Sequence, residues 1–216
     1  GLLPFLSAFH TREGAAVNLY LPGRMELTTP GGQPLAICVE TGYPVQEEIR
    51  LQLELAAPEE FCLELRIPGW CRRPRASVNG APFPADAGWL RLRRRWERGD
   101  VLVLAFPMEL SLTRSDQLEE EVQGLPLYGV LRRGPVVMAR DASLDGPGLD
   151  SELDLPAGEN GRVEARPVGP EQLPFPAEQA YAVSLAGGRE VCVVDYASAG
   201  KDYDVRMAAW FPLKAL

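Results

Sequence analysis

The sequence has 216 residues, of which 46% are hydrophobic and 24% charged, an ordinary balance for a globular protein long enough to form two small domains. The formal net charge of −8 argues against nucleic acid as a partner, because phosphate binding needs a basic surface. No run of 18 apolar residues and no secretion signal is visible, so the sequence predicts no membrane partner and a cytoplasmic location.

The first residues predict the end of a helix. Residues 1–10 carry leucine and phenylalanine at spacings that would give a helix one apolar face. The chain begins with Gly1 rather than Met, which suggests a piece of a longer polypeptide.

The stretch from residue 15 to residue 108 has the period of β-strands, in which side chains alternate between two faces. Residues 49–55 show it most clearly, since four aliphatic residues share one phase and polar residues share the other. Asn79-Gly80 is the commonest signal for a tight hairpin. Strands are predicted at residues 15–21, 24–28, 35–41, 49–55, 61–67, 76–78, 89–93 and 101–106. Residues 15–108 are therefore interpreted as a first β-sandwich.

The strand pattern is weaker after residue 108. Residues 143–176 are rich in Gly, Pro, Asp and Glu and have little periodicity, so a long loop is expected there. Further strands are predicted at residues 125–131, 136–140, 181–185, 190–194 and 205–211. Residues 109–204 are interpreted as a second, smaller β-sandwich. The predicted fold class is thus all-β, with two tandem antiparallel β-sandwiches of jelly-roll type.

Residue types that usually carry catalysis or bind metals are scattered. His10 is the only histidine, and without partner side chains it makes neither a catalytic triad nor a zinc site. The four cysteines show no CxxC pairing and are interpreted as free buried thiols, although Cys62 and Cys71 could also approach one another. The acidic runs at 119–121 and 150–154 are interpreted as solvated surface, with a calcium site at the second as the alternative. No catalytic residue, cofactor or metal site is therefore predicted for this chain.

Arginine is concentrated around three tryptophans. The chain has 20 arginines and two lysines, and eight of the arginines lie near Trp70, Trp89 and Trp96, among them Arg72 and Arg91. Such a ridge could contact carbohydrate by ring stacking and hydrogen bonding, or could dock on an acidic face of a neighbouring domain. A third interpretation is that Trp70 and Trp96 fill the ends of the sandwich while the arginines remain solvated.

An ordered series of short motifs resembles one enzyme family. The motifs, in chain order, are Asn18-Leu19-Tyr20-Leu21-Pro22, Thr41-Gly42-Tyr43-Pro44, Arg66-Ile67-Pro68-Gly69-Trp70, Val78-Asn79-Gly80, Trp96-Glu97-Arg98-Gly99-Asp100, Pro107-Met108, Leu131-Arg132-Arg133-Gly134-Pro135-Val136-Val137, Asp195-Tyr196-Ala197 and Trp210-Phe211-Pro212. Together they resemble the region that follows the catalytic domain in glycoside hydrolase family 127, the β-L-arabinofuranosidase group, also catalogued as domain of unknown function 1680.

The resemblance implies a supporting role without chemistry. In the resembling enzymes an upstream (α/α)6 barrel carries out hydrolysis with a cysteine nucleophile, an acid/base glutamate and a zinc ion, and none of these features matches this sequence. The resemblance therefore implies a non-catalytic C-terminal region that docks on and stabilises that barrel. It also implies that residues 1–14 are the tail of the upstream helical domain and that residues 205–216 return to complete the first sandwich. A carbohydrate-binding module is the alternative function, and carbohydrate and a second copy of the chain are further candidate partners.

Overall fold

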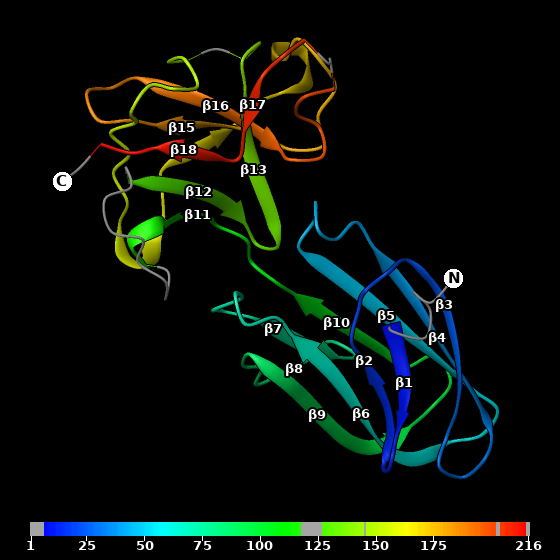
Figure 1. The fold of residues 1–216 in the computed structure, drawn as a ribbon. Coiled ribbons are helices and arrows are strands. Elements are labelled where there is room, and N and C mark those ends of the chain that lie inside the picture. The colour runs from blue at the N-terminus through cyan, green and yellow to red at the C-terminus, as the bar shows by residue number, and fades with distance from the viewer. Residues whose placement is uncertain (1–6, 118–126, 145, 202–203, 215–216) are drawn as a thin grey trace. The chain divides into compact units, whose positions relative to one another are not determined.

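The computed structural model describes residues 7–117, 127–144, 146–201 and 204–214. Contacts divide the chain into two compact units, Gly1–Met108 and Glu109–Leu216, each of which has its own sheets and core. Strands dominate both units, and the helical elements named among the described residues are three short 3₁₀ turns, so the predicted all-β fold class is confirmed (Figure 1). Within the described ranges, no helix has the length and apolar character needed to cross a membrane.

The first unit is a sandwich of two sheets (Figure 1). Strand order is β1-β2-β6-β9 in the four-stranded sheet and β3-β4-β5-β10-β7-β8 in the six-stranded sheet. The pairing of β2 with β6 is parallel, and the other pairings are antiparallel. The strands are β1 (Ala8–Thr11), β2 (Gly14–Val17), β3 (Gly23–Thr28), β4 (Pro34–Thr41), β5 (Glu48–Leu55), β6 (Glu59–Ile67), β7 (Arg75–Val78), β8 (Ala81–Phe83), β9 (Gly88–Trp96) and β10 (Val101–Ala105).

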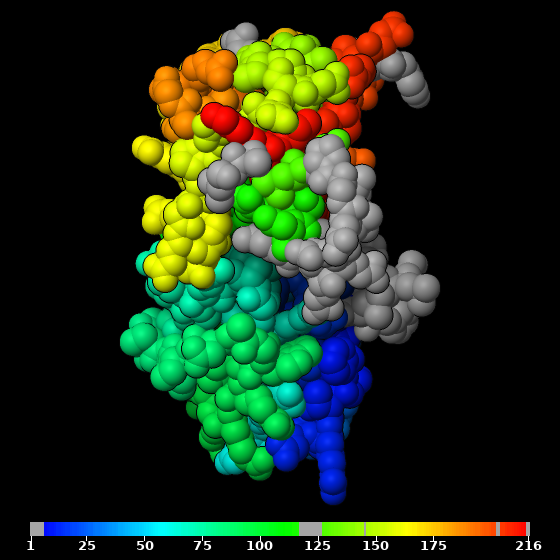
Figure 2. All heavy atoms as spheres, turned by 60° about the vertical axis from the view of Figure 1, so that its left-hand side comes forward, coloured from blue at the N-terminus to red at the C-terminus, as the bar shows by residue number. Residues whose placement is uncertain are grey.

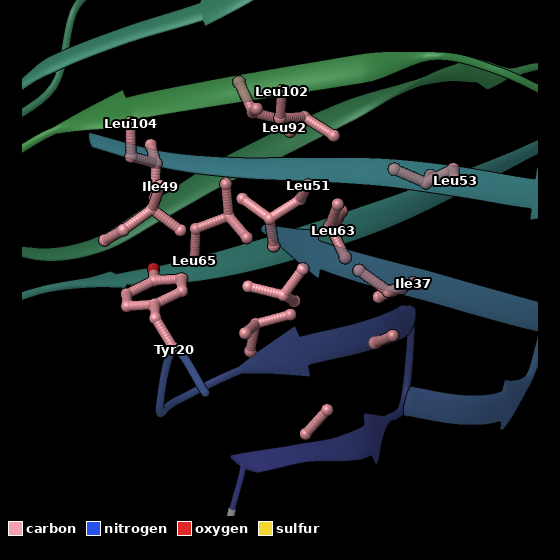
Figure 3. Packing of buried hydrophobic residues seen from close by; sticks show 14 of the residues in the cluster. Tyr20, Ile37, Ile49, Leu51, Leu53, Leu63, Leu65, Leu92, Leu102 and Leu104 are labelled. Atoms are coloured by element: carbon pink, nitrogen blue, oxygen red, sulfur yellow. The ribbon is translucent and has the colours of Figure 1, made fainter. Parts of the chain in front are cut away.

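Alternation of apolar residues builds one core between these two sheets. On β5, Ile49, Leu51 and Leu53 are fully buried, while Arg50 and Gln52 between them are exposed. Strands β6, β9 and β10 supply residues with the same period, and all of these side chains meet in a single cluster (Figure 3). Each fully buried aliphatic side chain of this kind stabilises the fold by about 1.5–3 kcal/mol through the removal of apolar surface from water.

The predicted Asn79-Gly80 hairpin is present between β7 and β8. Both residues have positive φ, 50° for Asn79 and 81° for Gly80, as a two-residue turn of this type requires. The Asn79 amide donates to Asp100 Oδ1 at 2.7 Å, and its Oδ1 accepts the N–H of Val101 at 2.8 Å. The turn is therefore held against the start of β10, the strand beside β7.

The second unit has one eight-stranded sheet (Figure 1). Its main path runs β11-β12-β13-β16-β15-β14, with β17 paired to β13 and β18 paired to β12. The elements are β11 (Leu110–Arg114), η1 (Ser115–Gln117), β12 (Tyr128–Arg133), β13 (Val136–Asp141), η2 (Glu159–Gly161), β14 (Ala165–Pro167), η3 (Pro170–Gln172), β15 (Ala180–Ser184), β16 (Glu190–Asp195), β17 (Met207–Ala208) and β18 (Trp210–Pro212). The stretch expected to be one long loop thus contains β14 and two 3₁₀ turns.

Both ends of the chain differ from the predicted domain boundaries. The prediction that residues 205–216 complete the first sandwich is wrong, because β17 and β18 pair within the second unit, where Phe211 is fully buried. The N-terminal helical tail is not found between residues 8 and 14, since β1 and the start of β2 occupy this stretch and Ala8 packs into the first core. The acidic run at 119–121 lies outside the described residues.

Candidate functional site

The arginine- and tryptophan-rich segment forms β9, an edge strand of the four-stranded sheet. Leu90, Leu92 and Trp96 pack into the core from this strand, and the residues of the other phase face solvent. The solvent side of this sheet, which we call the β9 face, carries Phe9, Glu13, Glu60, Glu64, Arg66, Trp89, Arg91, Arg93 and Arg95. In the space-filling view of Figure 2, the green residues of this part of the sequence gather at the surface of the first unit.

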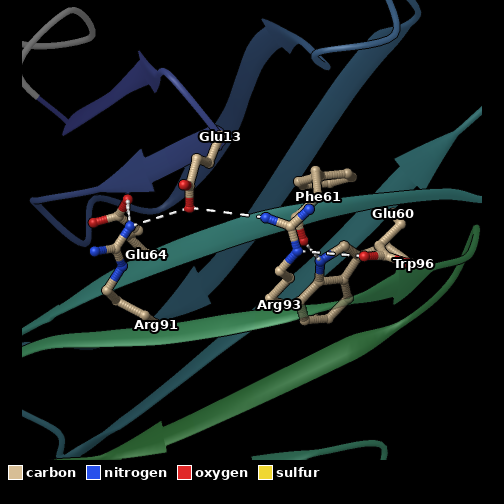
Figure 4. A network of polar contacts seen from close by, with 7 residues as sticks. All are labelled: Glu13, Glu60, Phe61, Glu64, Arg91, Arg93 and Trp96. Carbon is tan, nitrogen blue, oxygen red and sulfur yellow. Dashed lines mark hydrogen bonds and ion pairs between the residues drawn. The ribbon is translucent and has the colours of Figure 1, made fainter.

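Two arginines and three carboxylates form a network of ion pairs across this face (Figure 4). Arg91 Nη2 lies 3.3 Å from Glu13 Oε2 and 3.4 Å from Glu64 Oε1. Arg93 Nη1 lies 3.9 Å from Glu13 Oε2, and its Nε lies 3.3 Å from Glu60 Oε1. Because both arginine side chains are more than half exposed, these pairs are screened by water and contribute little to the free energy of unfolding. Their effect is to fix where the charges lie.

Local contacts keep the central arginine charged. A hydrogen bond with Cys62 and the charges of Glu64 and Glu13 raise the pKa of Arg91. Cys62 lies on the same phase of β6 as Glu64, and its side chain is buried beneath this charged layer. Arg91 is therefore a cationic group at a defined position on the β9 face.

Trp96 does not belong to the exposed ridge that the sequence suggested. Its side chain is fully buried, and Nε1 donates to the Phe61 carbonyl at 3.1 Å. The guanidinium carbon of Arg94 lies 5.0 Å from the centre of the Trp96 ring. Its burial agrees with the interpretation in which Trp96 packs inside the sandwich, and Trp96 shares the phase of Leu90 and Leu92 on this strand.

The other two tryptophans have different environments. Trp70 is half-buried, and its ring meets Phe106 edge-on at 6.2 Å between centroids. Trp89 is 44% exposed and pairs edge-on with Phe9 from β1, at 6.3 Å and an interplanar angle of 81°. Arg72 is exposed between β6 and β7. The three tryptophans thus form no coplanar platform, and Trp89 with Phe9 supplies the aromatic part of the β9 face.

Two residues that contact the β9 side chains, Phe9 and Glu13, were not predicted from the sequence. Phe9 and Glu13 precede the arginine-rich segment by about eighty residues, and only the pairing of β2 with β6 and of β6 with β9 brings them to it. The separation of the two N-terminal residues from β9 in sequence leaves no local signal for the contact. Their position depends on a parallel strand pair, which short-range patterns do not predict.

Groups that could carry metal or acid–base chemistry are dispersed. None of the four cysteines forms a disulfide, so Cys62 and Cys71 are not joined to one another. Within the described part of the chain, no three His, Cys, Asp or Glu side chains are grouped to hold a metal ion. His10 Nε2 accepts the backbone N–H of Thr28 at 3.0 Å, which is a structural contact. The β9 face brings together cations, carboxylates and two exposed aromatic rings, and is therefore the candidate site of this chain.

Comparison with known families matches the first unit. Residues 14–108 fit the model of the middle domain of β-L-arabinofuranosidases of glycoside hydrolase family 127, a span of somewhat under half of the chain. The model places this segment in the middle of such enzymes, whereas the motifs predicted a C-terminal region. No protein with curated annotation is similar enough in sequence to match.

Three solved structures share the fold along nearly the whole chain. A family 127 β-L-arabinofuranosidase from Geobacillus stearothermophilus T6 aligns with a TM-score of 0.71 and 24% identity, over 97% of this chain and 35% of that one. A second glycoside hydrolase aligns with a TM-score of 0.73 and 22% identity, over 97% of this chain and 37% of its own. A family 127 β-arabinofuranosidase aligns with a TM-score of 0.69 and 22% identity, over 94% of this chain and 35% of its own.

These likenesses show the fold, and the chain spans about a third of the length of the three enzymes. Residues 14–108 of the first unit match the middle-domain model of the same family that the sequence motifs resemble, and the likeness to the solved glycoside hydrolases extends over nearly all of this chain.

Proposed function

We propose that this chain is a non-catalytic β-sandwich region of a glycoside hydrolase related to the β-L-arabinofuranosidases, and that it docks on and stabilises an (α/α)6-barrel catalytic domain. The match of residues 14–108 to the middle-domain model is the observation that carries this proposal. The share of about a third that the chain covers in the similar enzymes is consistent with such a region.

The β9 face is the surface we propose for docking. Arginine and aromatic side chains are enriched in protein interfaces and supply much of their binding energy. Here Trp89 and Phe9 are exposed at 44% and 41%, and Arg91 and Arg93 are held at fixed positions beside them. A partner surface with carboxylates opposite the arginines and an apolar recess for Trp89 would fit this pattern.

Hydrolysis assays test the non-catalytic part of the proposal. The chain alone should release no arabinose from a β-linked L-arabinofuranoside above the rate of the buffer blank, measured by a coupled sugar assay. Release at a rate that is proportional to the protein concentration and survives repurification would contradict the proposal.

Docking is tested in the polypeptide that joins the chain to its catalytic barrel. Trp89→Ala should lower the thermal midpoint of the barrel and shorten the half-life of its activity, because the substitution removes the ring that we propose fills a recess on the barrel. Phe83→Ala is the matched control, since Phe83 is also an exposed aromatic residue, at 37%, but lies on β8 of the other sheet. Equal midpoints for Trp89→Ala, Phe83→Ala and the parent polypeptide would rule out docking through the β9 face.

A carbohydrate-binding module is the second candidate, and the exposure of Trp89 favours it. An exposed indole ring can stack on a sugar ring while nearby arginines donate to its hydroxyl groups. Retardation of the chain in native gels containing arabinan, abolished by Trp89→Ala and not by Phe83→Ala, would support this function. Unchanged migration would remove it.

A further inference from the structure

A groove lies on one face of the sheet of the second unit. Its volume is 460 Å³, and its lining comes mainly from β14, β15, β16 and the segment around η3. Ala182 and Cys192 form its floor and are directly opposite one another in the pairing of β15 with β16. Because both side chains are small, they leave a depression in the sheet surface.

The next strand pair along the same face is covered. Ala180 and Val194 are paired across β15 and β16 and are buried in a cluster with Leu173, Phe175 and Ala177. These three residues belong to the segment after η3, which covers the pair. The groove lies beyond this cover, over a strand pair with small side chains in which Ala182 is buried and Cys192 is half-buried.

One wall of the groove is a fixed ion pair. Arg166 Nε lies 3.1 Å from Glu190 Oε1, and Nη2 lies 2.6 Å from Oε2, so the two groups meet in the bidentate arrangement. The hydrogen bond raises the pKa of Arg166 and lowers that of Glu190, which keeps both charged. The guanidinium plane is thus held in one orientation with its remaining N–H groups free to donate.

The rest of the lining is apolar with a polar rim. Leu144, Val168 and Leu173 supply aliphatic surface, and Glu171 and Gln172 supply hydrogen-bonding groups at the edge. The groove thus offers polar and aliphatic surface side by side, and its volume lies in the range of about 300–1,000 Å³ that is usual for small-ligand sites.

We infer that this groove binds a neutral mono- or disaccharide. The planar guanidinium, carboxylate and amide groups can pair with adjacent hydroxyls of a sugar, and the aliphatic wall can contact its C–H surface. The charges of Arg166, Glu171 and Glu190 sum to −1, which disfavours an anionic ligand. This inference concerns the second unit alone and does not depend on the docking role proposed for the β9 face.

Protection of Cys192 from alkylation tests the inference. The full chain is treated with iodoacetamide with and without L-arabinose, D-glucose or maltose at rising concentrations, and each cysteine peptide is followed by mass spectrometry. Cys38 is an internal control, because it is also half-buried and lies beside an Arg–Glu pair, that of Arg24 and Glu54. At least one sugar should slow alkylation of Cys192 several-fold and leave Cys38 unchanged, while glycerol at the same concentration should protect neither.

Variants assign the protection to the groove. Arg166→Gln should weaken the protection about tenfold, the effect expected from losing hydrogen bonds donated by a charged group. Arg206→Gln is the control, because it breaks another exposed bidentate pair of the same unit, with Asp150, that does not line the groove. Equal alkylation rates with and without every sugar, equal slowing at both cysteines, or protection unaltered by Arg166→Gln would overturn the inference. None of these results would bear on docking through the β9 face.

Discussion

The two units bury different kinds of side chain. The core of the first unit is one cluster of aliphatic and aromatic residues, contributed by strands of both sheets. The second unit has apolar clusters as well, but it also buries Arg140, Asp141 and Asp195, at 2%, 5% and 5% exposure. Charged groups are rarely buried to this extent unless they are hydrogen-bonded.

Arg140 on β13 shows what these charges do. Its two Nη atoms donate to the carbonyls of Pro147, Gly148 and Leu149, three consecutive residues of an irregular segment. Burial lowers the pKa of Arg140. One strand residue therefore supplies the hydrogen bonds that the backbone of this segment would otherwise take from a strand or from water.

The buried aspartates act in the same way on N–H groups. Asp195 Oδ1 accepts the N–H groups of Glu178 and Gln179, both at 3.0 Å, and Oδ2 accepts the hydroxyl of Ser198 at 2.8 Å.

The first unit also uses such a residue, Asp100 at 8% exposure, which accepts hydrogen bonds from Asn79 and Glu97 in two turns. The comparison teaches that the second unit depends more on single charged residues, which hold irregular segments against its sheet.

The largest loss of stability is expected from a substitution in the core of the first unit. Phe106 is fully buried, and its ring contacts Tyr20, Tyr43 and Trp70. Phe106→Ala should lower the free energy of unfolding of the first unit by about 3–5 kcal/mol, because it removes apolar contacts and leaves a cavity. Urea unfolding followed by tryptophan fluorescence measures this loss, since three of the four tryptophans lie in this unit.

Phe83→Ala is the control for this prediction, because Phe83 is exposed and its removal should change the midpoint little. A loss of similar size in both variants would mean that the single core does not dominate the stability of the first unit.

An intermediate effect is expected from a buried charge of the second unit. Asp195→Ala removes the acceptor of the Gln179 N–H and of the Ser198 hydroxyl, and leaves the Glu178 N–H only its longer bond to Ser198 Oγ at 3.3 Å. It should cost about 2–3 kcal/mol of the free energy of unfolding. Amide hydrogen exchange should accelerate at Glu178 and Gln179 while exchange in the first unit stays unchanged. Glu152→Ala, at an exposed carboxylate of the same unit, is the control. Protection that remained at both amides would show that Asp195 does not hold this segment.

The smallest effect is expected from a carboxylate near the surface of the first unit. Glu59 accepts hydrogen bonds from Thr29, Gly31 and Gln33, and that from Thr29 contributes most to lowering the pKa of Glu59 below its usual 4.5. A lowered folded-state pKa stabilises the fold above pH 4.5, and this stability is lost as the pH falls through the folded-state value. Glu59→Gln should cost about 1 kcal/mol at neutral pH and flatten the acid limb of the stability curve.

Urea midpoints measured from pH 7 down to pH 3 test whether the contribution of Glu59 to stability is lost as the pH falls. Glu60→Gln is the neighbouring control, since the Glu60 side chain is exposed and pairs with the exposed Arg93. An acid limb of equal steepness in Glu59→Gln and the unmodified chain would contradict the assigned role.

Much of the first unit could be predicted from the sequence because its strands obey a simple period. The strand predicted at residues 49–55 is β5, and the hairpin at Asn79-Gly80 joins β7 and β8. The same period explains the opposite fates of two tryptophans, since Trp96 shares the phase of the buried leucines of β9 and Trp89 shares that of its exposed arginines.

The remaining features depend on contacts that a local pattern does not contain. Arg140 and Asp195 resemble surface residues in the sequence, and only their packing against distant backbone shows otherwise. The contact between Phe9 and Trp89 requires the order of four strands, one pair of them parallel. The resemblance implied that residues 205–216 complete the first sandwich, and this prediction is wrong because β18 pairs with β12 of the second unit.

The sole histidine makes one of these long-range contacts observable. His10 lies on β1, an edge strand of the four-stranded sheet, and Thr28 ends β3, an edge strand of the six-stranded sheet. Their hydrogen bond requires an Nε2 atom without a proton, which fixes the imidazole as the Nδ1–H tautomer. A chain with a single imidazole gives a single set of ring nitrogen resonances, so the closure of the sandwich at this edge can be followed spectroscopically without assigning any other signal.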